Sequence, residues 1–287
     1  MSDFKIGVIG KGFVGSAVSF GFSANVGVDY EIRIFDVDPQ KSSHSLEETV
    51  NDSDFVFISV PTPANSSGEI DLSILDKCLA QINGCIVDNN TIFLIRSTVV
   101  PGSSRYFQQR YPNLKIVFNP EFLTERSANF DFISQTRYVL GGDAKDTGKV
   151  ADMYRNRFGK NISIIETSFE SAELIKYMCN TYFAMKVSFL NEMKILSDIS
   201  GANWDDCIEG FVRDGRIGHS HMNVPGPDGK FGFGGSCFPK DIQAIIKYAE
   251  SKDFSMETLK GAWKTNLNVR PERDWENLKG RAVSEGE

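Results

Sequence analysis

The chain has 287 residues, of which 41% are hydrophobic and 24% are charged, and its formal net charge at pH 7 is −7. This size and composition are typical of a soluble globular protein and favour two domains over one. The acidic balance argues against nonspecific nucleic-acid binding, although it leaves room for a local basic pocket that receives an anionic small molecule.

Two further features of the sequence narrow the class of protein. No apolar run reaches the roughly 18 residues of a membrane span, and the N-terminus enters an apolar stretch without a signal-peptide pattern. The five cysteines are an odd number at irregular spacings, which matches neither a disulfide framework nor a C-x-x-C metal site. We therefore expect a cytoplasmic protein with free thiols, no bound metal and no membrane partner.

The first predicted element is a strand in FKIGVIG, followed by the pattern G-x-G-x-x-G at Gly10, Gly12 and Gly15 and then a helix-like run. A second predicted strand, YEIRIFD, ends in Asp36. Dinucleotide-binding folds place a carboxylate here to accept the ribose hydroxyls, and their glycine turn and helix N-terminus receive the pyrophosphate. A plain tight turn and a solvated strand end are the structural alternatives. Because a 2′-phosphate would meet like charge at Asp36, the pattern favours NAD over NADP.

Five more apolar runs predict strands, namely DFVFISV, TIFLIRS, KIVF, TRYVLGG and NISIIET. Their alternation with helical stretches predicts an α/β fold with a Rossmann-like, doubly wound and mostly parallel sheet over residues 1–166. In such sheets ligands bind beyond the carboxyl ends of the strands, so we expect Thr98 and Glu121 on the cofactor side.

After Thr167 the apolar period becomes helical up to about residue 199. Thr167 and Glu170 form a capping-box pattern, and Gly201 is a plausible end. A helix of this length extends about 50 Å, enough to join two domains or to form a dimer core. Its apolar positions recur every three or four residues, at Ile175, Met178, Tyr182, Met185, Phe189, Met193 and Leu196. We expect an all-α central domain over residues 167–270 and a polar C-terminal tail over 271–287.

Lys176 and Asn180 share a face of this helix away from the main apolar stripe. Such a pair could instead consist of ordinary solvated helix residues without a functional role.

The stretch FGFGGSCFPKD places Cys237 just before a predicted helix, because Pro239 suits a first helical turn. The helix dipole and Lys240 would both favour the nucleophilic thiolate, and Asp241 would position a lysine or a water near the sulfur. A small buried cysteine is the structural alternative. The glycines of this stretch would let a ligand approach the backbone closely; they are Gly232, Gly234 and Gly235.

These motifs together resemble the nucleotide-sugar 6-dehydrogenase family, typified by UDP-glucose dehydrogenase and with GDP-mannose dehydrogenase as a close relative. GVIGKGFVG, ISVPTP, RSTVVPG, NPEFLTE, ELIKYMCNTYFAMKVSFLNE and GFGGSCFPKD occur in the family's order between residue 4 and about residue 250. The resemblance implies a four-electron oxidation of a sugar C6 alcohol to a uronate, with NAD as hydride acceptor and Cys237 as the nucleophile that captures the aldehyde. UDP-glucose is the first substrate it suggests.

The resemblance also implies roles for matching residues. Lys176 would stabilise an oxyanion, Asn180 would orient the substrate, and Asp241 would align a lysine or water. Thr98 would hold a water, and Glu121 would act as a general base. The expected cofactor-binding residues are Gly10, Gly12, Phe13, Val14, Gly15, Asp36, Pro61, Thr62, Thr98 and Lys240. The expected substrate-binding residues are Glu121, Phe122, Leu123, Glu125, Lys176, Asn180, Arg216, Phe231, Gly232, Gly234 and Gly235. Arg216 would reach a neighbouring subunit's substrate, so we expect a homodimer or a higher homo-oligomer.

Two departures from the family pattern keep other functions open. The loop before Cys237 is longer than in the best-known members and contains His219 and His221, which we expect to have a loop or substrate-contact role. We also expect the family's C-terminal nucleotide-binding domain to be missing. One alternative is a two-electron 3-hydroxyacid-type dehydrogenase, which needs no nucleophilic thiol. The other is a nucleotide-sensing or binding protein of the same fold without turnover.

Overall fold

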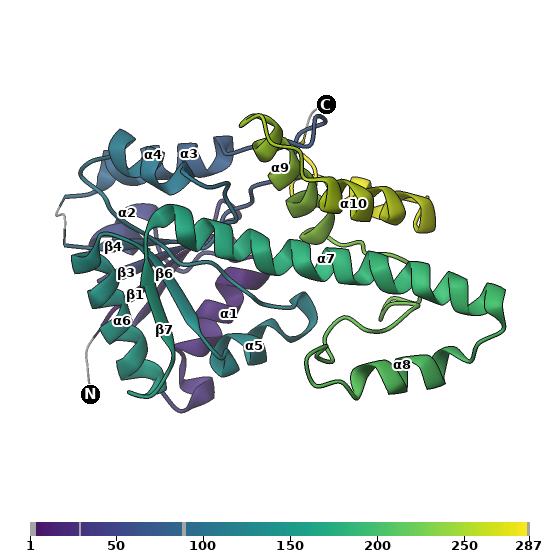
Figure 1. Cartoon of the computed structure of the whole chain (residues 1–287). Helices are drawn as coiled ribbons and strands as arrows, with labels where there is room; N and C mark the ends of the chain where they lie inside the picture. Colours follow the sequence, from purple (N-terminus) through teal and green to yellow (C-terminus); the bar gives the residue numbers. More distant parts are fainter. Residues whose placement is uncertain (1–3, 29, 88–89, 286–287) are drawn as a thin grey trace. The chain divides into compact units, whose positions relative to one another are not determined.

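The computed structural model describes residues 4–28, 30–87 and 90–285 (Figure 1). They form two compact units. The first comprises Met1–Thr62 and Leu72–Lys176, and the second comprises Pro63–Asp71 and Tyr177–Glu287. In the described part of the chain, no helix is both long enough and apolar enough to cross a membrane. The domain boundary expected at residue 166 stays a prediction.

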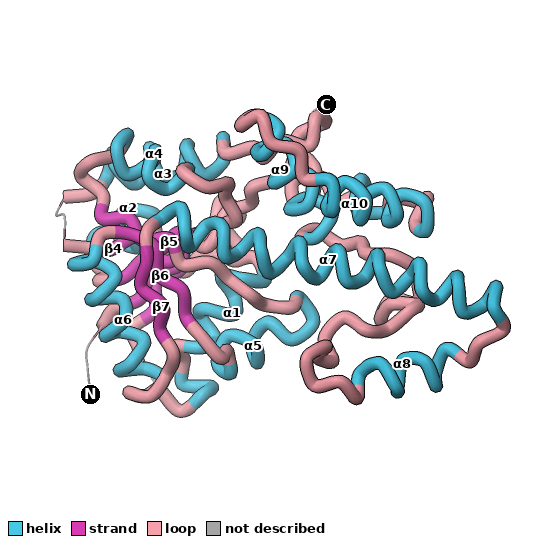
Figure 2. The backbone as a smooth tube through the Cα atoms, viewed as in Figure 1, coloured by secondary structure: helices cyan, strands magenta, loops and turns pink. Residues whose placement is uncertain are grey.

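The first unit is built on a seven-stranded sheet with the order β2-β1-β3-β4-β5-β6-β7, whose strands are drawn in magenta in Figure 2. All neighbouring strands run parallel except β5 and β6. This confirms the predicted Rossmann-like sheet and each predicted strand. The strands are β1 Ile6–Ile9, β2 Ile32–Phe35, β3 Phe55–Ile58, β4 Ile92–Ile95, β5 Lys115–Phe118, β6 Tyr138–Gly142 and β7 Ile164–Thr167.

Helices cover both faces of this sheet and form two apolar cores. Side chains of α2, α3 and α4 pack with one face, and side chains of α1, α5 and α6 pack with the other. Every residue of β1, β3 and β4 is buried, which explains why these strands read as continuous apolar runs. The helical elements are α1 Phe13–Gly21, η1 Ala24–Val26, α2 Leu46–Asn51, α3 Ser73–Cys85, α4 Ser103–Arg110, η2 Glu125–Ser127, α5 Ala128–Ser134 and α6 Ala144–Phe158.

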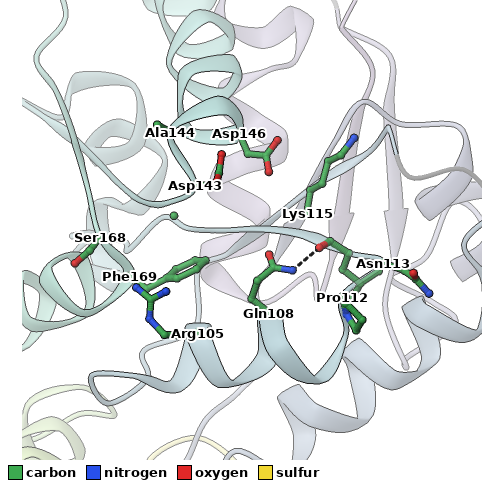
Figure 3. Close-up of a pocket in the computed structure, with 12 residues that line it drawn as sticks. Arg105, Gln108, Pro112, Asn113, Lys115, Asp143, Ala144, Asp146, Ser168 and Phe169 are labelled. Carbon is green, nitrogen blue, oxygen red and sulfur yellow. Dashed lines mark hydrogen bonds between the residues drawn. The ribbon is translucent and has the colours of Figure 1, made fainter.

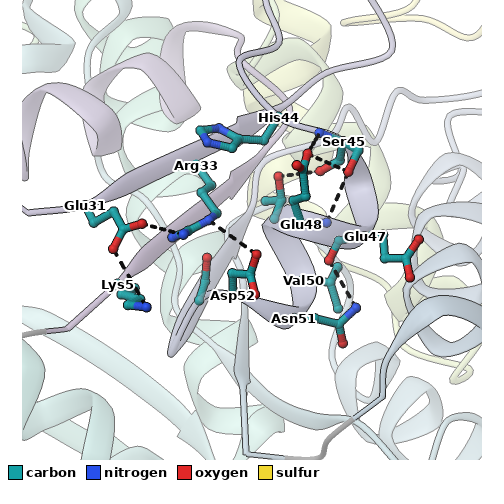
Figure 4. A network of polar contacts seen from close by, with 12 residues as sticks. Lys5, Glu31, Arg33, His44, Ser45, Glu47, Glu48, Val50, Asn51 and Asp52 are labelled. Carbon is teal, nitrogen blue, oxygen red and sulfur yellow. Dashed lines mark hydrogen bonds and ion pairs between the residues drawn. The ribbon is translucent and has the colours of Figure 1, made fainter.

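Polar contacts at the surface fix where α2 begins (Figure 4). The Ser45 hydroxyl accepts from the Glu48 backbone N–H at 3.2 Å, and the Glu48 carboxylate accepts from the Ser45 N–H at 2.8 Å. This reciprocal capping box satisfies two N–H groups that the helix cannot. Beside it, Arg33 of β2 pairs with Glu31 and lies 3.9 Å from Asp52. Because both acidic partners are exposed, these ion pairs contribute little to stability.

The second unit is helical and contains the segment expected to be a tail. Its helices are the part of α7 Phe169–Ser200 from residue 177 onward, α8 Trp204–Val212, α9 Phe238–Glu250, α10 Glu257–Val269 and η3 Asp274–Asn277. Trp275 is buried and its ring lies 5.3 Å from that of Trp263. Ala282 is also buried, and Val283 forms a β-bridge with Ala64. Within residues 271–285, the segment expected to be a tail is therefore packed into this unit.

The long helix α7 confirms the helical period, but its capping residue is Ser168, one residue later than the predicted cap Thr167. Thr167 belongs to β7, and the Ser168 hydroxyl accepts from the Ser171 backbone N–H at 3.2 Å. The capping-box assignment to Thr167 and Glu170 was wrong because the strand continues through Thr167. At the other end the helix stops at Ser200, and Gly201 has a φ of 74°, as the glycine predicted.

Candidate functional site

The glycine turn after β1 has the geometry that a dinucleotide requires. Gly10 has a φ of 88°, and a Cβ on Gly15 would lie 2.0 Å from the Gly10 carbonyl oxygen. Neither position tolerates a side chain. A Cβ on Gly12, the N-cap of α1, would meet nothing within 4 Å. Open space at a helix N-terminus suits a pyrophosphate. These residues fit NAD.

Asp36 lies where the sequence predicted, directly after β2. Its Oδ2 accepts from the Lys11 backbone N–H at 2.6 Å, and its Oδ1 accepts from the Asp38 N–H at 2.9 Å. The carboxylate is therefore held against the glycine turn. Of the other residues expected at the cofactor, Phe13 and Val14 form the first turn of α1.

The loops after β3 and β4 are joined at this same end of the sheet. The hydroxyl of buried Thr62 donates to the Thr98 carbonyl oxygen at 2.8 Å, and Thr98 is buried as well. Pro61, the residue before Thr62, is exposed. The carboxyl ends of β1, β3, β4 and β5 share one edge because these strands are parallel.

Glu121 and Lys176 form a buried ion pair. The Lys176 Nζ donates to the Glu121 Oε1 at 2.7 Å and to its carbonyl oxygen at 2.6 Å, and the two residues are 5% and 2% exposed. The second carboxylate oxygen of Glu121 accepts from the Leu123 N–H at 2.7 Å. The Lys176 Nζ also lies 5.6 Å from the Phe122 ring centroid. Glu125, in η2, is exposed.

A second buried carboxylate lies one turn earlier on α7. Glu173 is fully buried, and its carboxylate accepts from the backbone N–H groups of Gly102 at 2.6 Å and Ser104 at 2.7 Å. It thus caps the N-terminus of α4 from another helix. Burial raises the pKa of Glu173 to about 7, although its backbone hydrogen bonds oppose that rise.

In the second unit, Cys237 is the N-cap residue of α9, with Pro239 in the first turn. This confirms its predicted place before a helix N-terminus. The Asp241 carboxylate accepts from the Asn180 Nδ2 at 2.6 Å and from the Lys240 Nζ at 2.5 Å. All three polar residues are buried. Asp241 therefore joins α7 to α9 and already balances the charge of Lys240.

Two of the three glycines before Cys237 serve internal packing. A Cβ on Gly232 would lie 2.4 Å from the Asn266 Oδ1, and a Cβ on Gly234 would lie 2.5 Å from the Arg270 guanidinium. Contacts within the unit are therefore enough to require glycine at Gly232 and Gly234, and the expectation that a ligand approaches these glycines stays a prediction. Only at Gly235, with a φ of 72°, would a Cβ meet nothing within 4 Å.

The loop that carries these glycines is fastened by buried polar side chains. Asn266 accepts from the Phe233 N–H at 2.7 Å and donates to its carbonyl oxygen at 3.0 Å. Arg270 donates to Asp228 at 2.7 Å and to Asp274 at 2.6 Å. The Phe231 carbonyl oxygen also accepts from Arg270, at 3.3 Å. This loop is therefore a fixed part of the unit.

Arg216 and the two histidines of the long loop, His219 and His221, are exposed residues of the second unit. Arg216 is exposed and pairs with Asp214 at 2.9 Å. The His221 ring stacks on Phe183 with centroids 4.3 Å apart. Its contact with Phe183 shields the His221 ring in part from solvent; this partial burial lowers the pKa of His221, and nearby Lys186 adds to the effect. Among the described residues, no group of three or more His, Cys, Asp or Glu side chains could hold a metal ion, and this includes the region of His219.

A cavity of about 600 Å³ lies elsewhere in the first unit (Figure 3). Its lining combines Arg105 and Lys115 with Asp143 and Asp146. None of the residues predicted to bind cofactor or substrate lines it, so its size does not make it the candidate site.

Two models of one protein family match the chain. The NAD-binding domain model of the UDP-glucose/GDP-mannose dehydrogenase family matches residues 40–157, and the central domain model of the same family matches residues 170–268. The chain belongs to the UDP-glucose/GDP-mannose dehydrogenase family. It therefore carries the family's NAD-binding and central domains, which confirms the resemblance and the cofactor expected from the sequence.

Individual relatives agree with this assignment. UDP-glucose 6-dehydrogenase of Rickettsia prowazekii is 33% identical over 248 residues, which cover 85% of this chain and 56% of the relative. The chain thus spans about half the length of the curated relatives it matches. The structure of a UDP-glucose dehydrogenase from Pyrobaculum islandicum has a TM-score of 0.80 at 27% identity, covering 93% of this chain and 68% of that one.

A shorter enzyme shares the fold alone. The 3-hydroxyisobutyrate dehydrogenase of Mycobacterium tuberculosis has a TM-score of 0.75 at 18% identity, with 95% of each chain covered.

Sequence reasoning missed the residues that support the site. Glu173 was noticed only as part of a motif, and Asn266 and Arg270 were not singled out. One local signal could have pointed to Glu173: it is an ionisable residue three positions before Lys176, in a stretch of the helix that is otherwise mostly apolar. The contacts of Asn266 with Phe233, and of Arg270 with Asp228 and Phe231, join distant parts of the chain and leave no local pattern.

We expect Glu173 to make the free energy of unfolding depend on pH. Its native pKa of about 7 exceeds the ordinary 4.5, so the native state binds more protons than the unfolded state between these values. Its contribution is fully present below pH 4.5 and is lost as the pH rises through 7, by at most about 3 kcal/mol. Urea unfolding measures this: from pH 5 to pH 8, the free energy of unfolding of Glu173→Gln should fall by less than that of the wild type.

Glu170→Gln is the matched control on the same helix. Hydrogen bonding with Arg105 lowers the pKa of Glu170 to about 2, so this group stays ionised from pH 5 to pH 8. Its variant should therefore keep the wild-type change in stability. Equal changes for Glu173→Gln and the wild type would contradict the prediction.

Proposed function

We propose that the protein oxidises the C6 alcohol of a nucleotide sugar to the uronate with NAD, and that UDP-glucose is the first substrate to test. The observation that carries this proposal is the place of Cys237 at the N-cap of α9, beside the buried Asn180–Asp241–Lys240 cluster. A dehydrogenase that stops at the aldehyde or ketone needs no such thiol. Family membership and the UDP-glucose 6-dehydrogenase relatives support the substrate class.

The proposed chemistry takes two hydrides from one carbon. NAD, when bound, accepts each hydride. The C6 alcohol loses the first hydride and its hydroxyl proton and becomes an aldehyde. The Cys237 thiolate then adds to this aldehyde, and the resulting alkoxide takes up one proton to form a thiohemiacetal. Loss of the second hydride converts this adduct to a thioester, and water then releases the carboxylate and regenerates the thiol. Covalent capture would hold the reactive aldehyde while the reduced cofactor is replaced.

The remaining residues receive roles that fit their surroundings. Lys176 would stabilise the developing oxyanion, since its buried ammonium is a strong electrostatic donor. Glu121 would serve as general base for hydrolysis, which requires one of its two engaged oxygens to exchange its partner for water. Thr98 would hold that water. In the second unit, Asn180 would orient the sugar and Asp241 would keep Asn180 and Lys240 in place.

The substrate-binding residues and the location of the protein remain predictions. Phe122, Leu123, Glu125, Phe231, Gly232, Gly234 and Gly235 would line the nucleotide sugar, and Arg216 would contact the substrate of a second subunit. A cytoplasmic location and the absence of nucleic-acid and membrane partners rest on the sequence alone.

A two-electron dehydrogenase acting on a 3-hydroxyacid is the second candidate. The 3-hydroxyisobutyrate dehydrogenase fold covers nearly the whole of this chain, and such a reaction would use Lys176 and Asn180 without Cys237. The matches to both nucleotide-sugar dehydrogenase domains favour the first candidate. NADH formation with a panel of nucleotide sugars and 3-hydroxyacids separates the two.

We expect the wild type to form two NADH per sugar and to release a uronate without free aldehyde. Cys237→Ser places a poorly ionised hydroxyl at the same position, so turnover should fall by at least about 1,000-fold while NAD and sugar affinity change little. Stopped-flow NADH absorbance and mass spectrometry of the product measure both effects.

Cys207→Ser is the control, because Cys207 is an exposed free thiol on α8. Its turnover should equal that of the wild type. Full two-NADH turnover by Cys237→Ser would show that the sulfur is not the nucleophile.

Asp36 should set the choice of cofactor. We expect the wild type to bind NAD at least tenfold more tightly than NADP, because a 2′-phosphate would face the Asp36 carboxylate. Asp36→Ala should narrow the ratio of the two Kd values about tenfold, or about 1.4 kcal/mol. Asp38→Ala, two residues further along the same turn, is the control and should leave the ratio unchanged. Equal wild-type affinity for both cofactors in a fluorescence titration would refute the assignment.

We also propose that a second copy of the chain covers the exposed apolar stripe of α7. Its side chains in the second unit are 39–61% exposed, namely Met178, Tyr182, Phe189, Met193 and Leu196. Contiguous apolar side chains on one helix face are typical of an interface.

We expect a dimer in sedimentation velocity, and a monomer when both Met178 and Leu196 are replaced by lysine, because the two charges would have to be buried. Phe254→Lys is the control, since Phe254 is 62% exposed outside the stripe. A wild-type monomer with full activity would contradict the proposal.

A further inference from the structure

A buried arginine without a carboxylate partner follows β4. Arg96 is 1% exposed, and its Nη1 donates to the Asn119 Oδ1 at 2.7 Å. Its Nε and Nη2 meet no hydrogen-bond acceptor among residues 4–28, 30–87 and 90–285. A buried guanidinium in this state is unfavourable relative to an apolar side chain of similar length. The Arg96 Cζ lies 5.7 Å from the Phe132 ring centroid, and this cation–π contact offsets part of that cost.

Its partner, Asn119, makes three further hydrogen bonds. The Asn119 backbone N–H donates to the Ile95 carbonyl oxygen at 2.9 Å. Its Nδ2 donates to the Val139 carbonyl oxygen at 2.9 Å, and its Oδ1 also accepts from the Tyr154 hydroxyl at 2.5 Å. Burial raises the pKa of Tyr154 to about 12, although nearby Arg96 opposes that rise, so this hydroxyl remains a donor at neutral pH. Asn119 is thus a fixed anchor for Arg96.

The hydrogen bond from Arg96 to Asn119 joins two loops just where the sheet ends. The β4–β5 register ends at Ile95 and Phe118, and the next residue of each strand is Arg96 and Asn119. Thr98 lies two residues beyond Arg96, and Glu121 lies two residues beyond Asn119. The side-chain bond therefore continues the link between the strands into the two loops that carry these residues.

We propose that Arg96 and Asn119 are positioning residues that fix the spacing of Thr98 and Glu121 during the reaction. The proposal rests on the proposed function for the roles of Thr98 and Glu121. Acid–base and electrostatic catalysis are sensitive to displacements of well under 1 Å, which one rigid side-chain bond between the loops would prevent. The unsatisfied nitrogens of Arg96 would then lower stability in return for a fixed spacing of the two loops.

Replacing Arg96 with methionine tests this, because methionine has similar length but no charge and no donor. We expect Arg96→Met to melt at or above the wild-type temperature, since it removes an unsatisfied buried charge. Its kcat should fall at least tenfold, whereas the KM for the sugar and the Kd for NAD should stay within about twofold. Arg96→Lys restores a charge and a donor toward Asn119, and should recover part of the lost kcat.

Tyr154→Phe is the matched control, because it removes another hydrogen bond to the same Asn119 oxygen but from α6. In this variant Asn119 keeps its hydrogen bonds with Arg96, Val139 and Ile95, so we expect kcat close to that of the wild type. We expect the melting temperature to fall by about 2–4 °C. Amide hydrogen exchange gives a readout that needs no turnover. Exchange over residues 97–102 and 120–124 should be faster in Arg96→Met than in Tyr154→Phe.

Each outcome decides the proposal. Wild-type kcat and exchange in Arg96→Met would overturn it, as would equal losses of kcat in Arg96→Met and Tyr154→Phe. A large fall in the melting temperature of Arg96→Met without recovery of kcat in Arg96→Lys would assign Arg96 a purely structural role. If the wild type oxidises no nucleotide sugar, the proposed function fails, and the exchange comparison still tests whether Arg96 holds the two loops.

Discussion

The buried ion pair between Lys176 and Glu121 is the constraint on which the candidate site in the first unit depends. A lysine and a glutamate that are almost fully inaccessible must keep their hydrogen bonds, because breaking such a pair by removing one partner typically costs about 3–5 kcal/mol. One turn earlier, Glu173 holds the backbone at Gly102 and Ser104. The first two turns of α7 therefore fix the loops that follow β4 and β5. A shift of this helix would disturb both loops together.

The sheet can carry this polar edge because the rest of it is apolar. Two cores, one on each face, bury the side chains of β1, β3 and β4 completely, and each buried aliphatic or aromatic side chain contributes about 1.5–3 kcal/mol. Against that background, Arg96 directly after β4 carries a guanidinium with two unsatisfied nitrogens, and Glu173 of α7, which binds the loop after β4, has a raised pKa. Both groups lower the stability of the fold, and both lie near the loops proposed to carry the reaction. Such costs are expected where the geometry of a site matters more than stability.

The sequence predicted what local patterns encode and missed what tertiary contacts decide. Buried strands appear as apolar runs, and the turn at Gly10 and Gly15 demands glycine for steric reasons, so both were recognisable. The start of α7 was misplaced by one residue because Thr167 suits a strand end as well as a cap. The neighbours of Gly232 were not predictable, since Asn266 reaches it from a helix 34 residues further along the chain. The bond from Arg96 to Asn119 likewise joins different strands.

The second unit shows how far a residue's chemistry depends on its neighbours. From the sequence, Lys240 and the helix dipole both favoured a thiolate at Cys237. In the structure the Lys240 ammonium is paired with Asp241, so its charge is already balanced there. The positive end of α9 is then the feature that favours an anion at its N-cap. Asp241 in turn holds Asn180, and Arg270 and Asn266 hold the glycine loop before the cysteine. The loop before Cys237 is therefore fastened by contacts within its own unit.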